Sequence, residues 1–71
     1  MLIHKGDTFI NDNGEMVQLN APHFGDYAVS IYHYNEETED FDIHDRDTIY
    51  TAAEIRRLAN AKSITWKEED I

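Results

Sequence analysis

The chain has 71 residues, 41% of them hydrophobic, and a domain of this length buries only about 60% of the surface that its unfolded chain exposes. It contains no cysteine, which excludes disulfides and thiolate metal sites, and no apolar run approaches the roughly 18 residues of a membrane-spanning helix. Fifteen acidic against six basic side chains give a net charge of −9. We therefore expect residues 1–71 to form one small acidic domain, monomeric and cytoplasmic, with no membrane segment and no room for a deep catalytic cleft.

The acidic residues are concentrated in one part of the sequence. No lysine or arginine lies between Lys5 and Arg46. The acids of this interval are Asp7, Asp12, Glu15, Asp26, Glu36, Glu37, Glu39, Asp40, Asp42 and Asp45. They alternate with tyrosine, isoleucine, phenylalanine and valine as in strands, whereas acidic disordered segments have few such residues. This pattern predicts a folded domain with an acidic face.

Residues 7–19 are expected to form a hairpin, because two short β-prone segments flank Asn13 and Gly14, a pair that supplies positive φ at a tight turn. A two-residue turn and a three-residue turn differ by one step in register, so either Phe9 or Ile10 faces the core. Residues 21–26 contain Pro22 and Gly25 and read as the connection to a second hairpin.

The second hairpin is expected to pair residues 27–34 with residues 40–45 around a polar loop, residues 35–39. If Tyr34 lies opposite Asp40, Ile31 lies opposite Ile43 and His33 opposite Phe41 on a core face. The opposite face then places Tyr32 across from Asp42. The register predicts a tyrosine and carboxylate surface on the side away from the core.

Residues 51–61 are predicted to form a helix, because Thr51 and Glu54 have the spacing of a capping box. An apolar stripe that includes Ile55 and Leu58 should lie on the sheet, with Arg56 and Arg57 outside. Residues 64–66 read as a last strand. The expected fold class is α+β, with an antiparallel sheet of four to five strands (two hairpins plus a C-terminal strand) and one α-helix packed on one face. The expected core residues are Val29, Ile31, Phe41, Ile43, Ile55, Leu58 and Trp66.

Motifs for catalysis or metal binding are weak. Residues 40–45 begin like a calcium loop, but the sixth position is Asp45 instead of glycine and the twelfth is Thr51 instead of glutamate. Histidines at positions 4, 23, 33 and 44 follow no zinc-ligand spacing, even with Asp42 or Asp45 added. No nucleophile elbow, phosphate loop or dinucleotide fingerprint is present. We expect neither an enzyme nor a metal or other cofactor.

The acidic face is the remaining candidate for function. Surplus charge keeps many small proteins soluble, but here the acids extend along a strand and alternate with tyrosines, which are common anchors at protein interfaces. The residues expected to contact a positively charged partner are Tyr32, Tyr34, Glu36, Glu37, Glu39, Asp40, Asp42 and Asp45.

In size, lack of cysteine, hairpin-rich plan and the acidic run over residues 36–47, the chain resembles the small acidic proteins by which phages disarm their hosts, in particular DNA-mimicking anti-CRISPR proteins. No diagnostic motif carries this resemblance, and Arg56 and Arg57 depart from a uniformly acidic mimic. The resemblance implies an inhibitor that occupies a basic nucleic-acid groove, that of a type I CRISPR surveillance complex, without itself binding nucleic acid.

Two alternatives remain open from the sequence. One is a small regulatory module that binds a protein partner through the helix, with Arg56 and Arg57 in contact. The other is a binding domain that depends on a metal ion. Binding that weakens with salt favours the acidic face, whereas salt-tolerant binding favours the helix.

Overall fold

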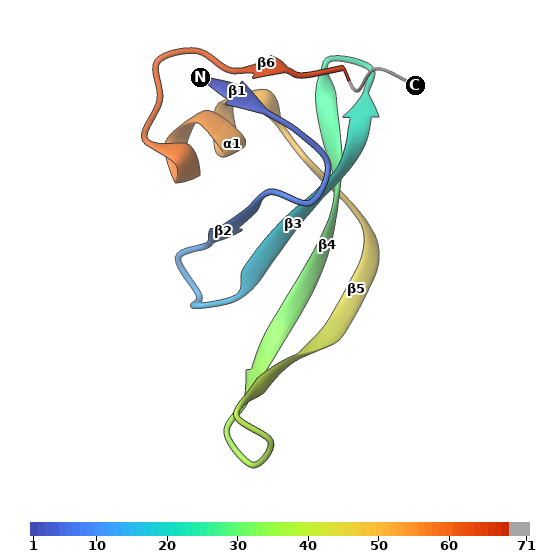
Figure 1. Ribbon diagram of the computed structural model, residues 1–71, viewed down its shortest axis with the longest axis vertical. Helices are drawn as coiled ribbons and strands as arrows, with labels where there is room; N and C mark the ends of the chain where they lie inside the picture. Colours follow the sequence, from blue (N-terminus) through green and yellow to red (C-terminus); the bar gives the residue numbers. More distant parts are fainter. Residues whose placement is uncertain (69–71) are drawn as a thin grey trace.

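The computed structural model describes residues 1–68, so the last three residues of the expected domain lie outside it. The elements in chain order are β1 (Leu2–Ile3), β2 (Thr8–Ile10), β3 (Met16–His23), β4 (Asp26–Asn35), β5 (Asp40–Tyr50), α1 (Ala52–Ala59) and β6 (Thr65–Trp66). Figure 1 shows a twisted sheet with the helix at one end and a long hairpin projecting at the other. The predicted α+β class is confirmed.

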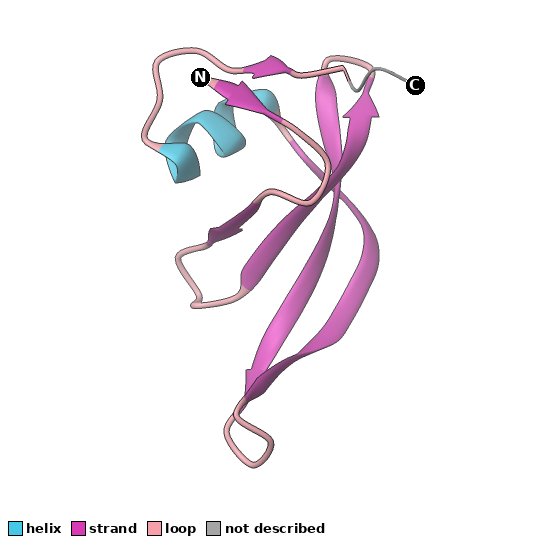
Figure 2. Ribbon diagram, viewed as in Figure 1, coloured by secondary structure: helices cyan, strands magenta, loops and turns pink. Residues whose placement is uncertain are grey.

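The main sheet has four antiparallel strands in the order β2-β3-β4-β5. The C-terminal strand forms as predicted, but it does not join this sheet. It pairs in parallel with the N-terminal strand, with Leu2 opposite Thr65 and Ile3 opposite Trp66 (Figure 2). The first and last strands of the described chain therefore lie side by side, outside the main sheet.

The first hairpin has a three-residue loop, which resolves its register. Asn11 and Glu15 are joined by a backbone hydrogen bond of 2.9 Å, and Gly14 takes a φ of 77° between them. A glycine with positive φ at the end of a three-residue loop is a common way to close a hairpin. Phe9 consequently packs against the core, whereas Ile10 is 56% exposed.

The connection expected over residues 21–26 is instead part of a continuous β3–β4 hairpin. Pro22 lies opposite Tyr27 in the ladder. Strand β2 pairs only with residues 16–18 of β3, so β3 is an edge strand at Pro22, where a residue without an N–H is tolerated. The turn consists of Phe24 and Gly25, with φ of 49° and 84°, and Phe24 is 95% exposed.

The predicted register of the β4–β5 hairpin is wrong by one residue. The loop has four residues, not five: Asn35 pairs with Asp40, and Tyr34 therefore pairs with Phe41. A slip of one residue moves each β5 side chain to the other face. Phe41 and Ile43 consequently lie with the tyrosines on the face away from the core, and Ile43 is 39% exposed. Their assignment to the core is corrected.

Two irregularities in β5 change its pairing further along. Tyr32 and Ile31 are adjacent on β4, but their partners Ile43 and Asp45 are separated by an extra residue on β5. A second extra residue lies between Asp45 and Thr48, the partner of Val29. The second irregularity is held by Ser30, whose hydroxyl donates to the Arg46 carbonyl at 3.2 Å and accepts from the Asn20 amide at 2.9 Å. Such bulges bend a strand and increase its twist.

The core lies between the sheet and α1. Its buried residues are Ile3, Val17, Leu19, Tyr27, Val29, Ile31 and Ile55. Leu58 and Trp66 are partly buried and pack against this cluster, so five of the seven predicted core residues are in it or against it. Within residues 1–68, no helix is long and apolar enough to cross a membrane.

The helix begins as predicted. The Thr51 hydroxyl caps it by accepting from the Glu54 N–H at 3.1 Å. It ends two residues earlier than expected, because Asn60 adopts a left-handed conformation with a φ of 53°. The left-handed C-cap turns the chain away from the helix axis.

Candidate functional site

The far end of the β4–β5 hairpin extends beyond the rest of the sheet. Strand β3 begins at Met16, opposite Tyr32, so β4 has no β3 partner after that point. Residues 33–42, which we call the arm, form a two-stranded ribbon that projects along the longest dimension of the molecule, 37 Å (Figure 1). The arm is accessible from both faces and from its tip.

Local contacts stiffen the arm, which an isolated two-stranded hairpin needs. At the tip, the Asn35 side-chain oxygen accepts from the N–H of Glu37 at 2.9 Å and its amide donates to Asp42 at 2.9 Å. Glu39 closes the loop with a φ of 55°. On one face, the rings of Tyr34 and Phe41 pack edge to face at 5.4 Å. The arm therefore presents its side chains from a fixed backbone.

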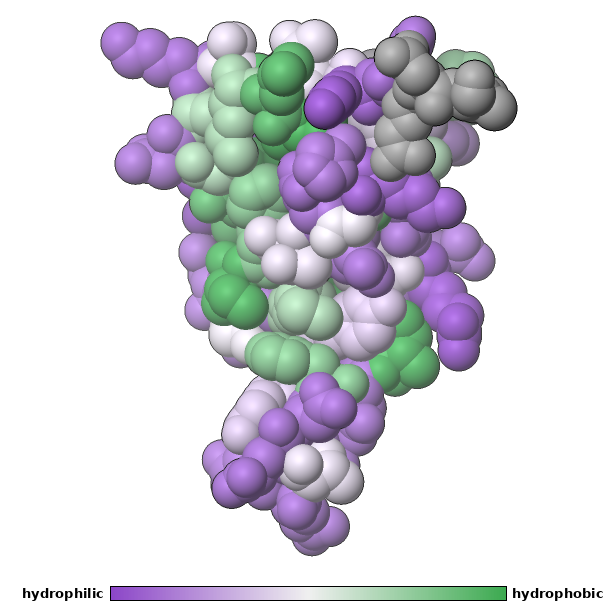
Figure 3. All heavy atoms as spheres, in the orientation of Figure 1, coloured by the Kyte–Doolittle hydropathy of each residue, from purple (hydrophilic) through white to green (hydrophobic). Residues whose placement is uncertain are grey.

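Five of the predicted partner-binding carboxylates lie in the arm: Glu36, Glu37, Glu39, Asp40 and Asp42. All are exposed, and the arm holds no lysine or arginine. Among residues 1–68, none of the side-chain ion pairs involves these five groups. Figure 3 shows the lower end of the molecule as mostly hydrophilic, whereas apolar and polar residues are mixed on the surface above it. The tip thus concentrates uncompensated negative charge.

The tyrosines and the strand acids, which were predicted to share one face, lie on opposite faces of the β4–β5 hairpin. Tyr34 pairs with Phe41, whereas Asp42 pairs with His33 on the other face. Tyr32 is half-buried and donates its hydroxyl to Gln18 at 2.8 Å. Tyr34 is 51% exposed. A partner would have to enclose the arm from both sides to contact both kinds of residue.

Asp45 lies outside the arm, at the irregularity opposite Ile31. Hydrogen bonding by the Thr48 side chain and by the Asp47 N–H, the latter at 3.0 Å, lowers the pKa of Asp45. Its carboxylate therefore stabilises the local backbone, and the structure gives it a role within the fold.

A second polar cluster lies at the base of the arm. Glu15, His33 and His44 each offer a metal-ligating atom, and these atoms lie within 4.8 Å of one another. The His33 ring contacts the Glu15 carboxylate and stacks on the His44 ring, with centroids 3.8 Å apart. A hydrogen bond from Asn11, followed by the contact with His33, lowers the pKa of Glu15.

This cluster was not predicted from the sequence. Glu15 lies 18 residues from its contact His33, and no local spacing links the two. The other two histidines are not part of it: His4 contacts Asp7, and His23 lies at the opposite end of β3.

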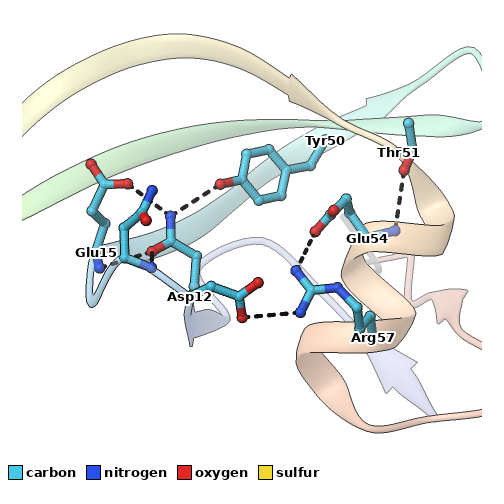
Figure 4. Close-up of polar contacts among 8 residues, drawn as sticks. Asp12, Glu15, Tyr50, Thr51, Glu54 and Arg57 are labelled. Atoms are coloured by element: carbon cyan, nitrogen blue, oxygen red, sulfur yellow. Dashed lines mark hydrogen bonds and ion pairs between the residues drawn. The ribbon is translucent and has the colours of Figure 1, made fainter.

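The helix arginines differ in their surroundings. Arg57 bridges Asp12 at 3.1 Å and Glu54 at 2.8 Å, and thereby ties the helix to the β2–β3 loop (Figure 4). These two hydrogen bonds raise the pKa of Arg57. The nearby Asn11 amide lies between Glu15 and the Tyr50 hydroxyl, to which it donates at 2.9 and 3.2 Å. Arg57 is thus engaged within the chain.

No protein-family model, curated protein or solved structure matches the chain. Function is therefore inferred from the geometry of the arm and of the cluster at its base.

Proposed function

We propose that the protein is a non-enzymatic inhibitor whose acidic arm occupies a basic, nucleic-acid-binding groove of another protein. The observation that carries the proposal is the arm itself, with five exposed carboxylates, no basic residue and a stiffened backbone that projects from the sheet. A groove lined with lysine and arginine attracts such a surface by the electrostatic steering that draws in nucleic acid.

The density of charge supports local imitation of a duplex. Three residue pairs and a loop give the arm a length of about 10 to 15 Å at the usual rise of a strand. Duplex DNA of about 12 Å carries roughly 7 phosphate charges, close to the five carboxylates of the arm. Over the full 37 Å of the molecule a duplex carries roughly 22 charges, more than twice the net −9 of the chain. The arm alone approaches the charge density of DNA.

The specific target follows from the resemblance to DNA-mimicking anti-CRISPR proteins. The proposed target is a type I CRISPR surveillance complex, in which the protein blocks the groove for target DNA. The protein would act in the cytoplasm of the host cell. In this arrangement the carboxylates occupy phosphate positions, while the exposed Tyr34 packs against the wall of the groove.

Competition with DNA tests the proposal. Binding of a fluorescent target duplex to a type I surveillance complex is measured by anisotropy with increasing wild-type protein, at low and high salt. We expect the protein to displace the duplex at low salt and to lose affinity as salt rises. The Glu36→Lys/Glu37→Lys variant changes the charge of the arm by four units at exposed positions, leaves the hydrogen bond between Asn35 and Asp42 intact, and should displace the duplex at least tenfold less well.

A matched control separates the position of the charge from its amount. Asp47→Lys/Glu68→Lys makes the same change in net charge at exposed residues outside the arm and should retain most of the inhibition. Equal loss in both double variants would contradict a site on the arm. If the wild type does not displace the duplex, this target is excluded. The immobilised wild type is then incubated with a bacterial lysate, and duplex DNA is used to elute the retained proteins. A protein that the duplex elutes has another nucleic-acid groove of the same kind.

The helix-mediated alternative is tested in the same assay. Arg57 already pairs with Asp12 and Glu54, so its reversal would also disturb the fold. Arg56→Glu leaves those pairs intact and should not change the inhibition. If Arg56 proves essential and the arm acids dispensable, the helix is the binding element.

A further inference from the structure

The cluster at the base of the arm joins residues from three separate parts of the sheet. Glu15 directly precedes β3, and since Met16 lies opposite Tyr32, Glu15 lies beside His33. His33 pairs with Asp42, and His44, the extra residue at the first irregularity of β5, stacks its ring on that of His33 with centroids 3.8 Å apart. The ladder therefore directs one carboxylate and two imidazoles to the same point.

We propose that Glu15, His33 and His44 form a binding site for a divalent transition-metal ion of the Zn²⁺ type. Two imidazole nitrogens and one carboxylate oxygen are a common ligand set for zinc with an open fourth position, which water or another ligand fills. Tetrahedral Zn²⁺ with bonds of about 2.0 to 2.2 Å holds its ligand atoms roughly 3.3 Å apart. The present atoms lie within 4.8 Å, so small side-chain rotations bring them to that distance.

The carboxylate is already oriented for this role. Asn11 donates its side-chain amide to one Glu15 oxygen at 2.9 Å, and the other oxygen contacts His33. Two further hydrogen bonds hold Asn11 in place. Its amide also donates to the Tyr50 hydroxyl, and the Asn11 side-chain oxygen accepts from the Glu15 N–H at 2.9 Å. Partners of this kind fix metal ligands in position and raise metal affinity.

The site is open to ions from solution. The side chains of His33 and Glu15 are 49% and 21% exposed. Two shallow pockets open beside His33, of about 370 and 480 Å³; Glu15 lines the first and His44 the second. An ion can therefore enter without rearrangement of the backbone, and the fourth position faces solvent.

The alternative for the same atoms is a hydrogen bond between His33 and Glu15 with His44 merely stacked beside it. The metal site and the simple hydrogen bond differ in the role of His44. A metal site needs the imidazole of His44 as a ligand, whereas the hydrogen bond between Glu15 and His33 persists without it.

Calorimetric titration with Zn²⁺ tests the proposal, on full-length protein without a polyhistidine tag. We expect one ion per chain and a higher Tm with Zn²⁺ than with EDTA, because an ion that binds only the folded state stabilises it. His33→Ala, His44→Ala and Glu15→Gln should each weaken binding at least tenfold. His23→Ala, at the other end of β3, should bind as the wild type does, and all four positions lie on the surface or at its edge, so the variants should fold.

Amide NMR shifts locate the ion independently of stability. Zn²⁺ should move the resonances around Glu15, His33 and His44 and leave those near His23 unchanged. Full affinity in His44→Ala, or shifts centred on another part of the chain, would overturn the proposal, as would the absence of binding to the wild type. None of these measurements involves DNA or the partner, so failure here is distinct from failure of the proposed inhibition.

Discussion

Phe24 adopts a backbone conformation that its side chain disfavours. It is the first central residue of the β3–β4 turn, with a φ of 49°, and its side chain is 95% exposed. Left-handed φ costs a residue with a Cβ roughly 1 kcal/mol, less for asparagine, which is favoured in such turns. Burial of the ring does not offset this cost.

Replacement of Phe24 by asparagine should therefore stabilise the protein, by about 0.5 to 1 kcal/mol. The measurement is urea unfolding followed by circular dichroism. Phe24→Ala is the control, because it removes the ring but keeps the disfavoured φ, and it should give no gain. A gain of equal size in both variants would show that loss of the ring, and not the backbone, is responsible.

The carboxylate of Asp45 should make stability depend on pH. Thr48 and the Asp47 N–H lower its pKa below the ordinary 3.8, so the ionised form is favoured in the folded state. This contribution is present above pH 4 and is lost as the pH falls through the lower pKa of the folded state. Wild type should be more stable than Asp45→Asn at pH 7, and the difference in urea midpoint should shrink by pH 3. A difference that stays constant over this range would contradict the assignment.

At the scale of elements, the register of the β4–β5 hairpin determines which isoleucine is structural. Ile31 is 6% exposed in the core, whereas its predicted partner Ile43 is 39% exposed on the opposite face. Ile31→Ala should cost about 2 to 5 kcal/mol, but Ile43→Ala only about 0.5 to 1 kcal/mol. Chemical denaturation of both variants measures the contrast. Equal losses of stability in the two variants would contradict the four-residue loop and favour the predicted five-residue loop.

The start of the helix could be predicted from sequence, because its cap is local. Thr51 and Glu54 lie three residues apart and form the expected hydrogen bond. The reciprocal half of the capping box was not predicted correctly, since Glu54 binds Arg57 instead of turning back to Thr51. Side-chain choices among several charged neighbours depend on tertiary positions that the sequence does not give.

The hairpin register could not be predicted, because its loop lacks a diagnostic pair. Asn13 and Gly14 mark the turn of the first hairpin. The loop of the β4–β5 hairpin instead has Glu39 at positive φ, and a glutamate in a sequence does not indicate that conformation. One residue of loop length then moved Asp42 to the face opposite Tyr34. The acidic character of the arm was predicted correctly; the grouping of its side chains was not.

The cluster of Glu15, His33 and His44 was missed for the same physical reason. Its members come together only through the pairing of three strands. The register of the first hairpin was left open between two alternatives, and the predicted register of the β4–β5 hairpin was wrong by one residue. The three side chains could therefore not be aligned from the sequence.

At the scale of the whole molecule, the uneven charge should make the fold sensitive to salt. The arm carries five carboxylates without a basic residue, and the net charge is −9. Salt at about 0.1 M screens charges beyond roughly 10 Å. Tm should rise between low salt and 0.5 M NaCl, and it should rise less in Asp40→Lys/Asp42→Lys, where repulsion is already reduced. A fall in wild-type Tm with salt would show that attractive pairs, such as Arg57 with Asp12, dominate instead.

The pairing of β1 with β6 has a consequence for the order of folding. Ile3, fully buried in the core, lies on β1, whereas its partner Trp66 lies on β6, at the other end of the described chain. Closing a loop of this length costs entropy before any contact repays it, and contacts between distant residues slow folding. The β2–β5 sheet can form as soon as residue 50 is available, with its apolar face still partly uncovered. The pairing of β1 with β6 then completes the core, and we expect it to be the last step of folding.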